Sequence, residues 1–254
     1  MRPLSWQGRQ VDQRVDAALQ ELTSRLRGTP EVVALWVGGS LATGDHVPGV
    51  SDLDLVAVTS APVRGDLLAE LVRIHEALDT GVASGLDLGV QYAEQSRLLD
   101  LEVEHPTWTH GELVDRVISL VTRAELVLHG FALDGPAPSQ LLPAMGPDEV
   151  RAAARAELAG YWSWAARHPR MFWHHPVMVD LGLTGMARAR HSIRTGELLT
   201  KTAAIEHANA PAWLKDQLRA RRRGETVRSP RRAGYVAWRD VRRTTSSAAP
   251  RAEA

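Results

Sequence analysis

Two short apolar runs, separated by a segment rich in glycine and serine, constrain the fold of this chain more than any other feature. The runs are EVVALWV (31–37) and DLDLVAVTS (52–60), and GGSLATGDHVPGVS (38–51) lies between them. Short apolar runs with β-branched residues, bounded by Gly, Ser and Pro, are typical of buried strands. The sequence therefore predicts two strands of a sheet, joined by a loop that carries polar residues.

The spacing of apolar residues elsewhere predicts further elements of both kinds. Apolar residues three and four apart favour a helix, and strict alternation, as in LDLGVQY (86–92), favours a strand. In the first part of the chain we expect helices at 7–27, 65–79 and about 111–123, and strands at 31–37, 52–60, 86–92 and about 125–134. After the proline-rich break GPAPSQLLP (135–143) we expect helices at 148–168, about 175–194, 201–209, 212–223 and 231–243.

These elements predict an α+β protein of two domains. The first domain, over 1–137, has a mixed sheet with helices, and the second, over 138–243, is an all-α helical bundle. The polar tail over 244–254 is expected to be disordered.

The composition excludes several classes of protein. The 254 residues include no cysteine, so disulfide scaffolds, cysteine zinc sites and thiol catalysis are ruled out. No apolar run approaches the roughly 18 residues of a membrane span. The first residues, MRPLSWQGRQ, lack the apolar core of a secretory signal. We therefore expect a cytoplasmic protein.

A net charge of zero conceals a strong polarity along the chain. Residues 1–137 contain 20 Asp and Glu against 10 Lys and Arg, and residues 138–254 contain 10 against 20. Such asymmetry indicates two domains that meet different partners or opposite ends of one substrate. The alternative is that the two halves only attract each other.

Two aspartates at the start of the second predicted strand are the strongest candidates for chemistry. Residues two apart in a strand face the same way, so Asp52 and Asp54 project two carboxylates side by side. A hard divalent cation such as Mg²⁺ relieves their repulsion, and Asp87 on the third strand could complete a triangle of carboxylates. Two metal ions held in this way assist nucleotidyl transfer. Acidic pairs also occur as merely solvated strand ends, and that interpretation stays open here.

The segment GGSLATGDHVPGVSDLDLVAV (38–58) resembles the signature of the DNA polymerase β-like nucleotidyltransferase superfamily. Three further segments resemble one branch of it, the aminoglycoside adenylyltransferases that inactivate streptomycin and spectinomycin. They are LDLGVQY (86–92), FALDGPAP (131–138) and RARHSIRTGELLTKTAAIEHA (188–208). The resemblance covers nearly the whole chain, and it implies a nucleotidyltransferase domain followed by a helical domain.

The resemblance also implies roles for residues of the first domain. Gly39 and Ser40 would bind the nucleotide triphosphate, and Asp52 and Asp54 would hold Mg²⁺. Asp87 stands where the family has its general base, although that residue is usually Glu. An aspartate is one methylene shorter, so Asp87 must lie closer to the acceptor or act through metal or water.

In the helical domain, Arg188 and Lys201 match a family Arg and Lys that reach the ATP phosphates, with their spacing kept. Relatives that accept streptomycin carry a Trp and an Asp ahead of this Arg, where the present sequence has Pro169 and His174. The resemblance therefore implies a spectinomycin-like acceptor rather than streptomycin.

The expected reaction is Mg²⁺-dependent transfer of AMP from ATP to a hydroxyl of a small cationic antibiotic, which would give resistance. The alternatives are a nucleic-acid or protein acceptor, and a non-catalytic nucleotide-binding regulator with the same fold. We do not expect a nucleic-acid partner, because the basic run at 219–223 is better explained as a solvated helix end.

Overall fold

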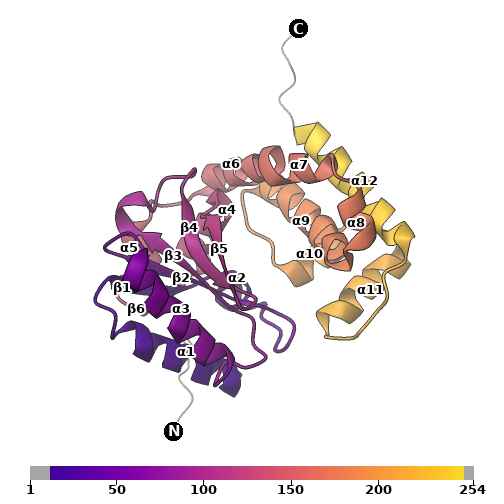
Figure 1. Ribbon diagram of the computed structural model, residues 1–254. Helices are drawn as coiled ribbons and strands as arrows, with labels where there is room; N and C mark the ends of the chain where they lie inside the picture. Colours follow the sequence, from indigo (N-terminus) through magenta and orange to yellow (C-terminus); the bar gives the residue numbers. More distant parts are fainter. Residues whose placement is uncertain (1–11, 249–254) are drawn as a thin grey trace. The chain divides into compact units, whose positions relative to one another are not determined.

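The computed structural model describes residues 12–248 of the chain. The chain divides into two compact units, Met1–Ala144 and Met145–Ala254 (Figure 1). The division therefore comes slightly later than the boundary at 137/138 expected from the sequence. The short helix α5 (Pro138–Leu141) accounts for the difference, because Leu141 and Leu142 pack into the core of the first unit.

The first unit contains a mixed sheet of six strands. The strands are β1 (Val32–Val37), β2 (Leu53–Thr59), β3 (Leu88–Glu94), β4 (Glu104–Thr109), β5 (Glu112–Val117) and β6 (Phe131–Asp134). Their order is β5-β4-β3-β2-β1-β6, and only β2 and β3 pair in parallel. The predicted α+β class is confirmed by this sheet and by the helical second unit.

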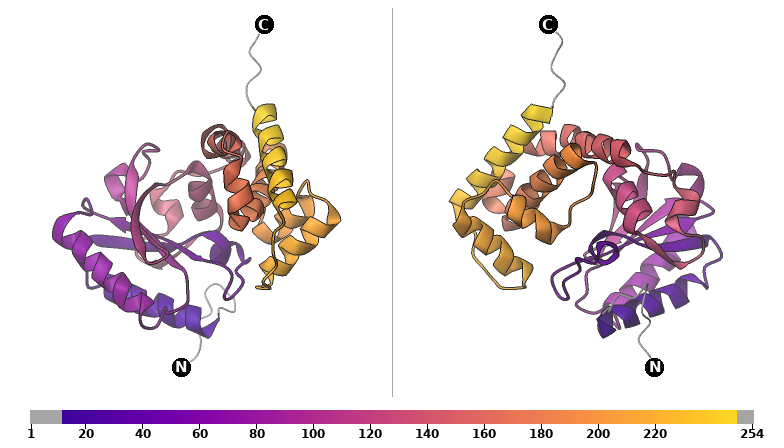
Figure 2. Two further views of the ribbon diagram at one scale, coloured as in Figure 1. Left: turned by 45° about the vertical axis from the view of Figure 1, so that its right-hand side comes forward. Right: turned by 180° about the vertical axis from the view of Figure 1, so that it is seen from behind.

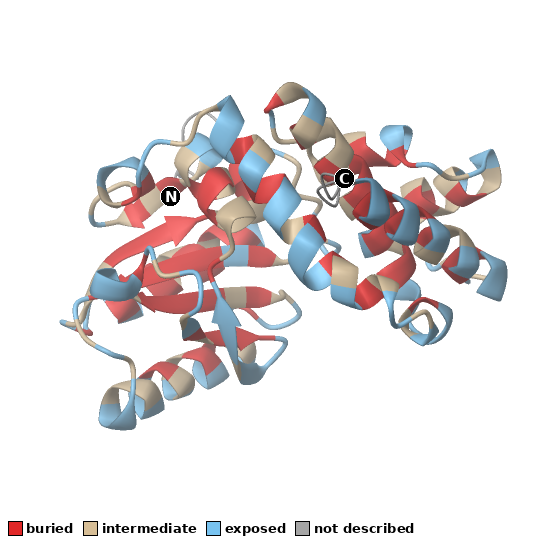
Figure 3. Ribbon diagram, turned by 90° about the horizontal axis from the view of Figure 1, so that it is seen from above, coloured by how far each residue is buried: buried red, intermediate tan, exposed pale blue. Residues whose placement is uncertain are grey.

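Helices cover both faces of this sheet, which explains why most residues of the central strands β1, β2 and β3 are apolar and buried. On one face, α1 (Gln13–Leu26) and α3 (Gly65–Asp79) bury their leucines against side chains of β1, β2 and β3. On the other face, Leu126 of α4 (Leu120–His129) packs with residues such as Trp36 and Val56. Figure 3 shows buried residues along much of the sheet.

Two predictions for residues 111–134 were wrong. The expected helix at 111–123 is the strand β5 followed by the start of α4, and the expected strand at 125–134 is most of α4 followed by β6. Strand β5 is a largely exposed edge strand, so it lacks the apolar alternation of a half-buried strand. Its partner β4 was not predicted at all, and pairing between these two strands overrides the local pattern.

The expected loop at 38–51 includes one short helix, α2 (Gly39–Thr43). The predicted helix at 7–27 begins in part outside the described residues, and its described portion is α1. No helix within residues 12–248 is long and apolar enough to span a membrane.

The described part of the second unit is helical throughout its regular elements (Figure 2). Its helices are α6 (Pro147–Glu157), α7 (Ser163–Ala166), α8 (Arg170–His174), α9 (Pro176–Thr195), α10 (Lys201–His207), α11 (Ala212–Arg222) and α12 (Arg231–Ala248). The predicted helix at 148–168 is interrupted by a π-helical turn over Leu158–Trp162, where Gly160 leaves helical geometry with ψ −109°. Glycine tolerates this break because it has no Cβ.

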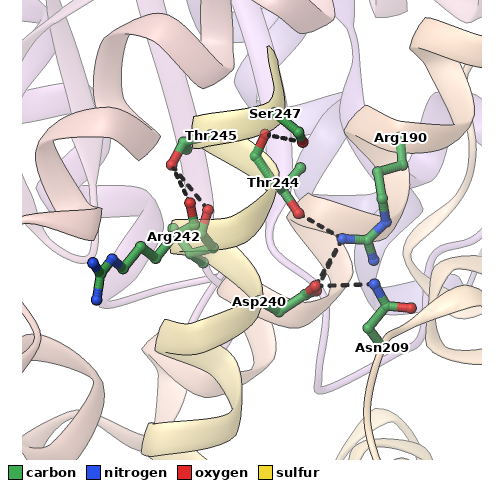
Figure 4. Close-up of polar contacts among 8 residues, drawn as sticks. Arg190, Asn209, Asp240, Arg242, Thr244, Thr245 and Ser247 are labelled. Atoms are coloured by element: carbon green, nitrogen blue, oxygen red, sulfur yellow. Dashed lines mark hydrogen bonds and ion pairs between the residues drawn. The ribbon is translucent and has the colours of Figure 1, made fainter. Parts of the chain in front are cut away.

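A partly buried ion pair joins the two longest helices of this unit. Arg190 on α9 donates from Nη1 to both carboxylate oxygens of Asp240 on α12, at 2.9 and 3.1 Å, and to Thr244 at 2.7 Å (Figure 4). Asn209 donates to the same carboxylate at 3.0 Å. These contacts hold the last turns of α12, which extends to Ala248, so the first residues of the expected tail are helical. The remainder of that tail, 249–254, lies outside the described residues.

Candidate active site

Asp52 and Asp54 line one cavity of about 230 Å³ beside the start of the inner strand β2. Asp54 is the second residue of β2 and Asp52 directly precedes this strand, so their side chains leave the backbone on the same side. The structure therefore places the two predicted carboxylates together.

The Gly38-Gly39 turn is built against Asp54. The Gly38 N–H donates to the Asp54 carbonyl at 2.8 Å, and Gly39 has a left-handed φ of +53°. A Cβ atom at position 39 would lie 1.9 Å from Oδ2 of Asp54. A larger residue at position 39 would therefore displace the Asp54 carboxylate.

Ser40 lies beside this cavity without lining it. Its Oγ is buried and has no hydrogen-bond partner within residues 12–248. An unsatisfied buried hydroxyl is costly, which favours a partner that the protein itself does not supply.

Asp87 directly precedes β3, next to the start of β2, and its carboxylate contacts His110. Leu53 pairs with Leu88 in the parallel ladder, so Asp52 and Asp87 precede their strands at the same level. The carboxylate of Asp87 is held by His110 in the turn between β4 and β5. The His110 Nδ1 lies 2.7 Å from Oδ2, and the His110 N–H donates to Oδ1 at 3.3 Å. Asp87 thus receives two contacts from one residue.

The three carboxylates do not form a closed cluster. Among the described residues, no group of three or more His, Asp or Glu side chains could hold a metal ion. Asp87 lines a second, more open cavity of about 340 Å³ with Asp79, and His110 lines both cavities. Asp52 and Asp54 stand as a pair, and Asp87 and His110 stand as another.

His110 was not identified as a site residue from the sequence. With φ 52°, it is the one non-glycine residue of the described chain in the left-handed region. This backbone conformation is strained for histidine, and such strain concentrates at functional sites. The sequence feature that could have identified it is the pair His110-Gly111. This pair can be recognised as a turn only when the strands β4 and β5 on either side of it are known.

A buried aromatic network supports the strand ends beneath Asp87. Trp108 of β4 donates from Nε1 to Asp79 at 2.9 Å, and its ring stacks on His75 with ring centres 5.2 Å apart. His75 also bonds the Tyr92 hydroxyl at 2.8 Å. Burial lowers the pKa of His75 to about 4, so this imidazole is neutral near pH 7.

The charge of Asp79 responds to the same surroundings. Burial raises the pKa of its carboxyl group, the hydrogen bond from Trp108 lowers it, and the nearby charge of Asp87 raises it again. Asp79 and Asp87 therefore form a compact acidic region near the second cavity, suited to a cationic group.

Strands β4 and β5 bring further polar groups to the first cavity. Its lining includes Gln91, Thr107, Thr109 and the exposed cation Arg116. Gln91 donates from Nε2 to the Arg116 carbonyl at 2.6 Å, which holds the edge strand against the sheet. Arg116 was not identified from the sequence, because the segment that carries it was predicted to be helical.

The predicted cations Arg188 and Lys201 both lie next to the loop that joins α9 to α10. Arg188 on α9 donates from Nε to the Leu199 carbonyl at 2.8 Å, in the loop that leads to Lys201. Lys201 is the first residue of α10, whose N-cap Thr200 accepts a hydrogen bond from the Ala203 N–H at 3.2 Å. The sequence spacing of these two cations therefore corresponds to spatial proximity within this unit.

Comparison with known proteins assigns the first unit. Residues 16–130 match the model of the nucleotidyltransferase domain family, and this range includes Gly39, Asp52, Asp54 and Asp87. The match confirms the predicted nucleotidyltransferase domain and, with it, the predicted enzyme class. No curated protein matches the chain.

Among solved structures, the chain is similar to the spectinomycin adenyltransferase AAD(9) from Enterococcus faecialis, crystallised with ATP and spectinomycin. The TM-score is 0.66 at 14% sequence identity, and the match covers 91% of this chain and 98% of that chain. At this identity the likeness shows a shared fold over both units.

Proposed function

We propose that this nucleotidyltransferase transfers AMP from ATP to a hydroxyl of an aminocyclitol antibiotic of the spectinomycin type. The observation that carries the proposal is the pair Asp52 and Asp54, which face one cavity of a nucleotidyltransferase domain with Gly39 packed against Asp54. The shared fold with a spectinomycin adenyltransferase supports the choice of acceptor. Pro169 and His174, in place of the Trp and Asp of streptomycin-accepting relatives, favour spectinomycin over streptomycin.

The cavity residues fit magnesium. Mg²⁺ is commonly held by one or two protein carboxylates together with substrate phosphates and water, so the pair Asp52 and Asp54 is sufficient. The other polar groups of the lining are the threonine hydroxyls, the Gln91 amide, His110, Arg116 and the Glu125 carboxylate, with no sulfur ligand among them. Bound Mg²⁺, as one or two ions, would neutralise negative charge on the entering and leaving oxygens. The sequence suggested Asp87 as a third metal ligand. We do not include it among the ligands, because it lines the second cavity and not the first.

We propose that Asp87 acts as the general base, which accepts the proton of the acceptor hydroxyl. The acceptor oxygen forms a bond to the α-phosphorus of ATP, the bond from that phosphorus to the bridging oxygen breaks, and pyrophosphate leaves. The proton of the acceptor hydroxyl passes to the Asp87 carboxylate. His110 would orient this carboxylate through its ring and its backbone N–H.

Charge supports the assignment of the two substrates. The carboxylates of Asp79 and Asp87 beside the second cavity suit a cationic aminocyclitol. Arg188 and Lys201 supply positive charge suited to a triphosphate, and we propose that both contribute to ATP binding. We propose Gly39 and Ser40 as further residues that bind the triphosphate.

The decisive experiment incubates purified protein with Mg²⁺ and ATP labelled at the α-phosphate. Spectinomycin, streptomycin, other aminoglycosides, tRNA and a protein mixture are offered as acceptors in separate reactions. We expect labelled spectinomycin and one pyrophosphate per transfer, with no label on streptomycin. Asp54→Asn should abolish transfer, and Asp66→Asn, an exposed aspartate in the first turn of α3, should not. Label on tRNA or protein instead of the antibiotic would overturn the proposed acceptor.

A further inference from the structure

The C-terminal helix α12 presents a continuous basic face to solvent. Six exposed residues define this face, namely Arg231, Arg232, Tyr235, Arg239, Arg242 and Arg243. At 100° per residue they fall within about 120° of the helix circumference. The two other exposed residues among 231–247 are serines, so the face contains no carboxylate. We call it the basic face of α12.

The opposite side of α12 is fixed in the second unit. Ala233, Ala237 and Val241 are fully buried in its core. The one acidic residue of the helix, Asp240, points to this side and is bound by Arg190 (Figure 4). Figure 4 also shows Arg242 directed away from Asp240. Packing of the opposite side therefore fixes the rotation of α12 about its axis and keeps the basic face exposed to solvent.

The neighbouring basic run at 219–223 behaves differently. Arg219 pairs with Glu206 and Asp216, Arg221 with Asp180, and Arg223 with Glu225. Much of the positive charge that is conspicuous in the sequence is thus neutralised within the chain.

The arginines of the basic face have no such neutralisation. No ion pair between described residues involves any of its five arginines. Arg232 lies over the ring of Trp213 at 4.3 Å and Arg242 over that of Trp238 at 5.6 Å. These contacts orient the guanidinium groups but leave their charge in place.

We propose that the basic face of α12 binds the phosphate backbone of a nucleic acid. Guanidinium groups match phosphate oxygens in bidentate geometry. The helix is about 27 Å long, which corresponds to roughly eight phosphates at about 3.4 Å along one strand. Tyr235, 51% exposed in the middle of the face, offers a surface for a base or sugar. A nucleic-acid partner was not expected from the sequence, in which only the basic run at 219–223 was considered.

An anionic membrane is a poorer fit to the same face. Helices that lie on membranes bury an apolar face among the lipids and keep their basic residues at its border. The apolar side of α12 is already buried in the protein, and the exposed side offers one tyrosine. The proposal does not depend on the reaction assigned to the first unit.

The test uses the full chain and fluorescence anisotropy with two labelled probes, a 20-nucleotide single-stranded RNA and a 20-base-pair DNA duplex. We expect binding at 50 mM NaCl that weakens steeply by 200 mM. The triple variant Arg239→Gln, Arg242→Gln, Arg243→Gln should bind at least 10-fold more weakly. It should also lower the slope of log K against log salt by roughly 2–3. Comparison of the probes identifies whether RNA or DNA is preferred.

The matched control is the triple variant Arg155→Gln, Arg167→Gln, Arg194→Gln. It makes the same change in net charge at exposed positions elsewhere in the unit, on α6, directly after α7 and on α9. We expect its affinity to stay within about 3-fold of the wild type. Circular dichroism verifies that both variants remain folded.

Three results would each overturn the proposal. The first is the absence of binding to either probe at 50 mM NaCl. The second is an equal loss of affinity in the two triple variants, which would indicate net charge alone. The third is equal or tighter binding to polyglutamate or to vesicles rich in phosphatidylserine, which would assign the face to another partner.

Discussion

The Asp87 carboxylate and His110 form a two-point contact at the edge of the sheet, through Nδ1 at 2.7 Å and the backbone N–H at 3.3 Å. Both donors reach the carboxylate because His110 has a left-handed backbone, at the turn between β4 and β5. This relationship gives Asp87 a defined orientation apart from Asp52 and Asp54. It also separates a proposed base from a proposed pair of metal ligands.

His110→Gly is expected to lower kcat about 10–100-fold while KM for ATP changes little. Glycine keeps the backbone N–H and adopts φ 52° without strain, so only the ring contact with Asp87 is lost. Steady-state kinetics measure kcat and KM, and thermal unfolding verifies that the variant stays folded. The control is His129→Gly at the exposed end of α4, which we expect to keep full turnover. An unchanged kcat in His110→Gly would remove the positioning role.

Asp52→Ala is expected to abolish transfer without loss of stability in EDTA. The variant relieves repulsion between two adjacent carboxylates, so the melting temperature without metal should stay the same or rise. Stabilisation of the wild type by Mg²⁺ and ATP should disappear in the variant, because a ligand stabilises only the state that binds it. Near-native turnover in this variant would contradict the metal assignment.

Gly39→Ala should abolish turnover, whereas Gly49→Ala should keep it. Both glycines have positive φ, at +53° and +74°, so each alanine costs about 1–2 kcal/mol of backbone strain. A Cβ at position 39 also meets Asp54 at 1.9 Å, and one at position 49 meets nothing within 4 Å. Comparable loss of activity in the two variants would mean that strain alone, and not the contact with Asp54, explains the effect.

Lys201→Ala should weaken MgATP binding by about 5–100-fold, equivalent to about 1–3 kcal/mol for a charge-assisted contact. Calorimetry should show little change in antibiotic affinity. Lys215→Ala is the control, since these are the two lysines of the chain and Lys215 donates to the Glu206 carbonyl at 2.7 Å. ATP affinity that is equal in both variants would exclude a phosphate-binding role for Lys201.

Stability should fall as pH decreases from about 6.5 to about 4 because of His75. Burial lowers the pKa of His75 to about 4 from the ordinary 6.5, so in this window the unfolded chain binds the proton more readily. The contribution is fully present above pH 6.5 and reaches on the order of 3 kcal/mol. Denaturant titrations at pH 7 and 5 should show a smaller pH dependence in His75→Gln than in the wild type. The exposed-histidine variant His129→Gln should match the wild type.

Local patterns were sufficient to predict the part of the site built from neighbouring residues. The strands around 31–37 and 52–60, the turn at Gly38-Gly39 and the pair Asp52 and Asp54 all follow from residues close in sequence. Alternation places residues two apart on the same side of a strand, and this rule needs no knowledge of distant segments. The helical second unit followed in the same way from its apolar spacing.

Tertiary structure decided everything that depends on pairing between distant segments. Strand β5 is a mostly polar edge strand that forms because β4 offers hydrogen-bond partners, so its local sequence could not identify it. The hairpin then places His110 against Asp87, 23 residues earlier in the chain, and Arg116 in the first cavity. Likewise, the sequence shows both arginine-rich segments of the second unit, but only the fold reveals that the one at 219–223 is paired and that on α12 is exposed. Charge and strand propensity are local properties, whereas the partners that neutralise or complete them are set by the packing of the whole unit.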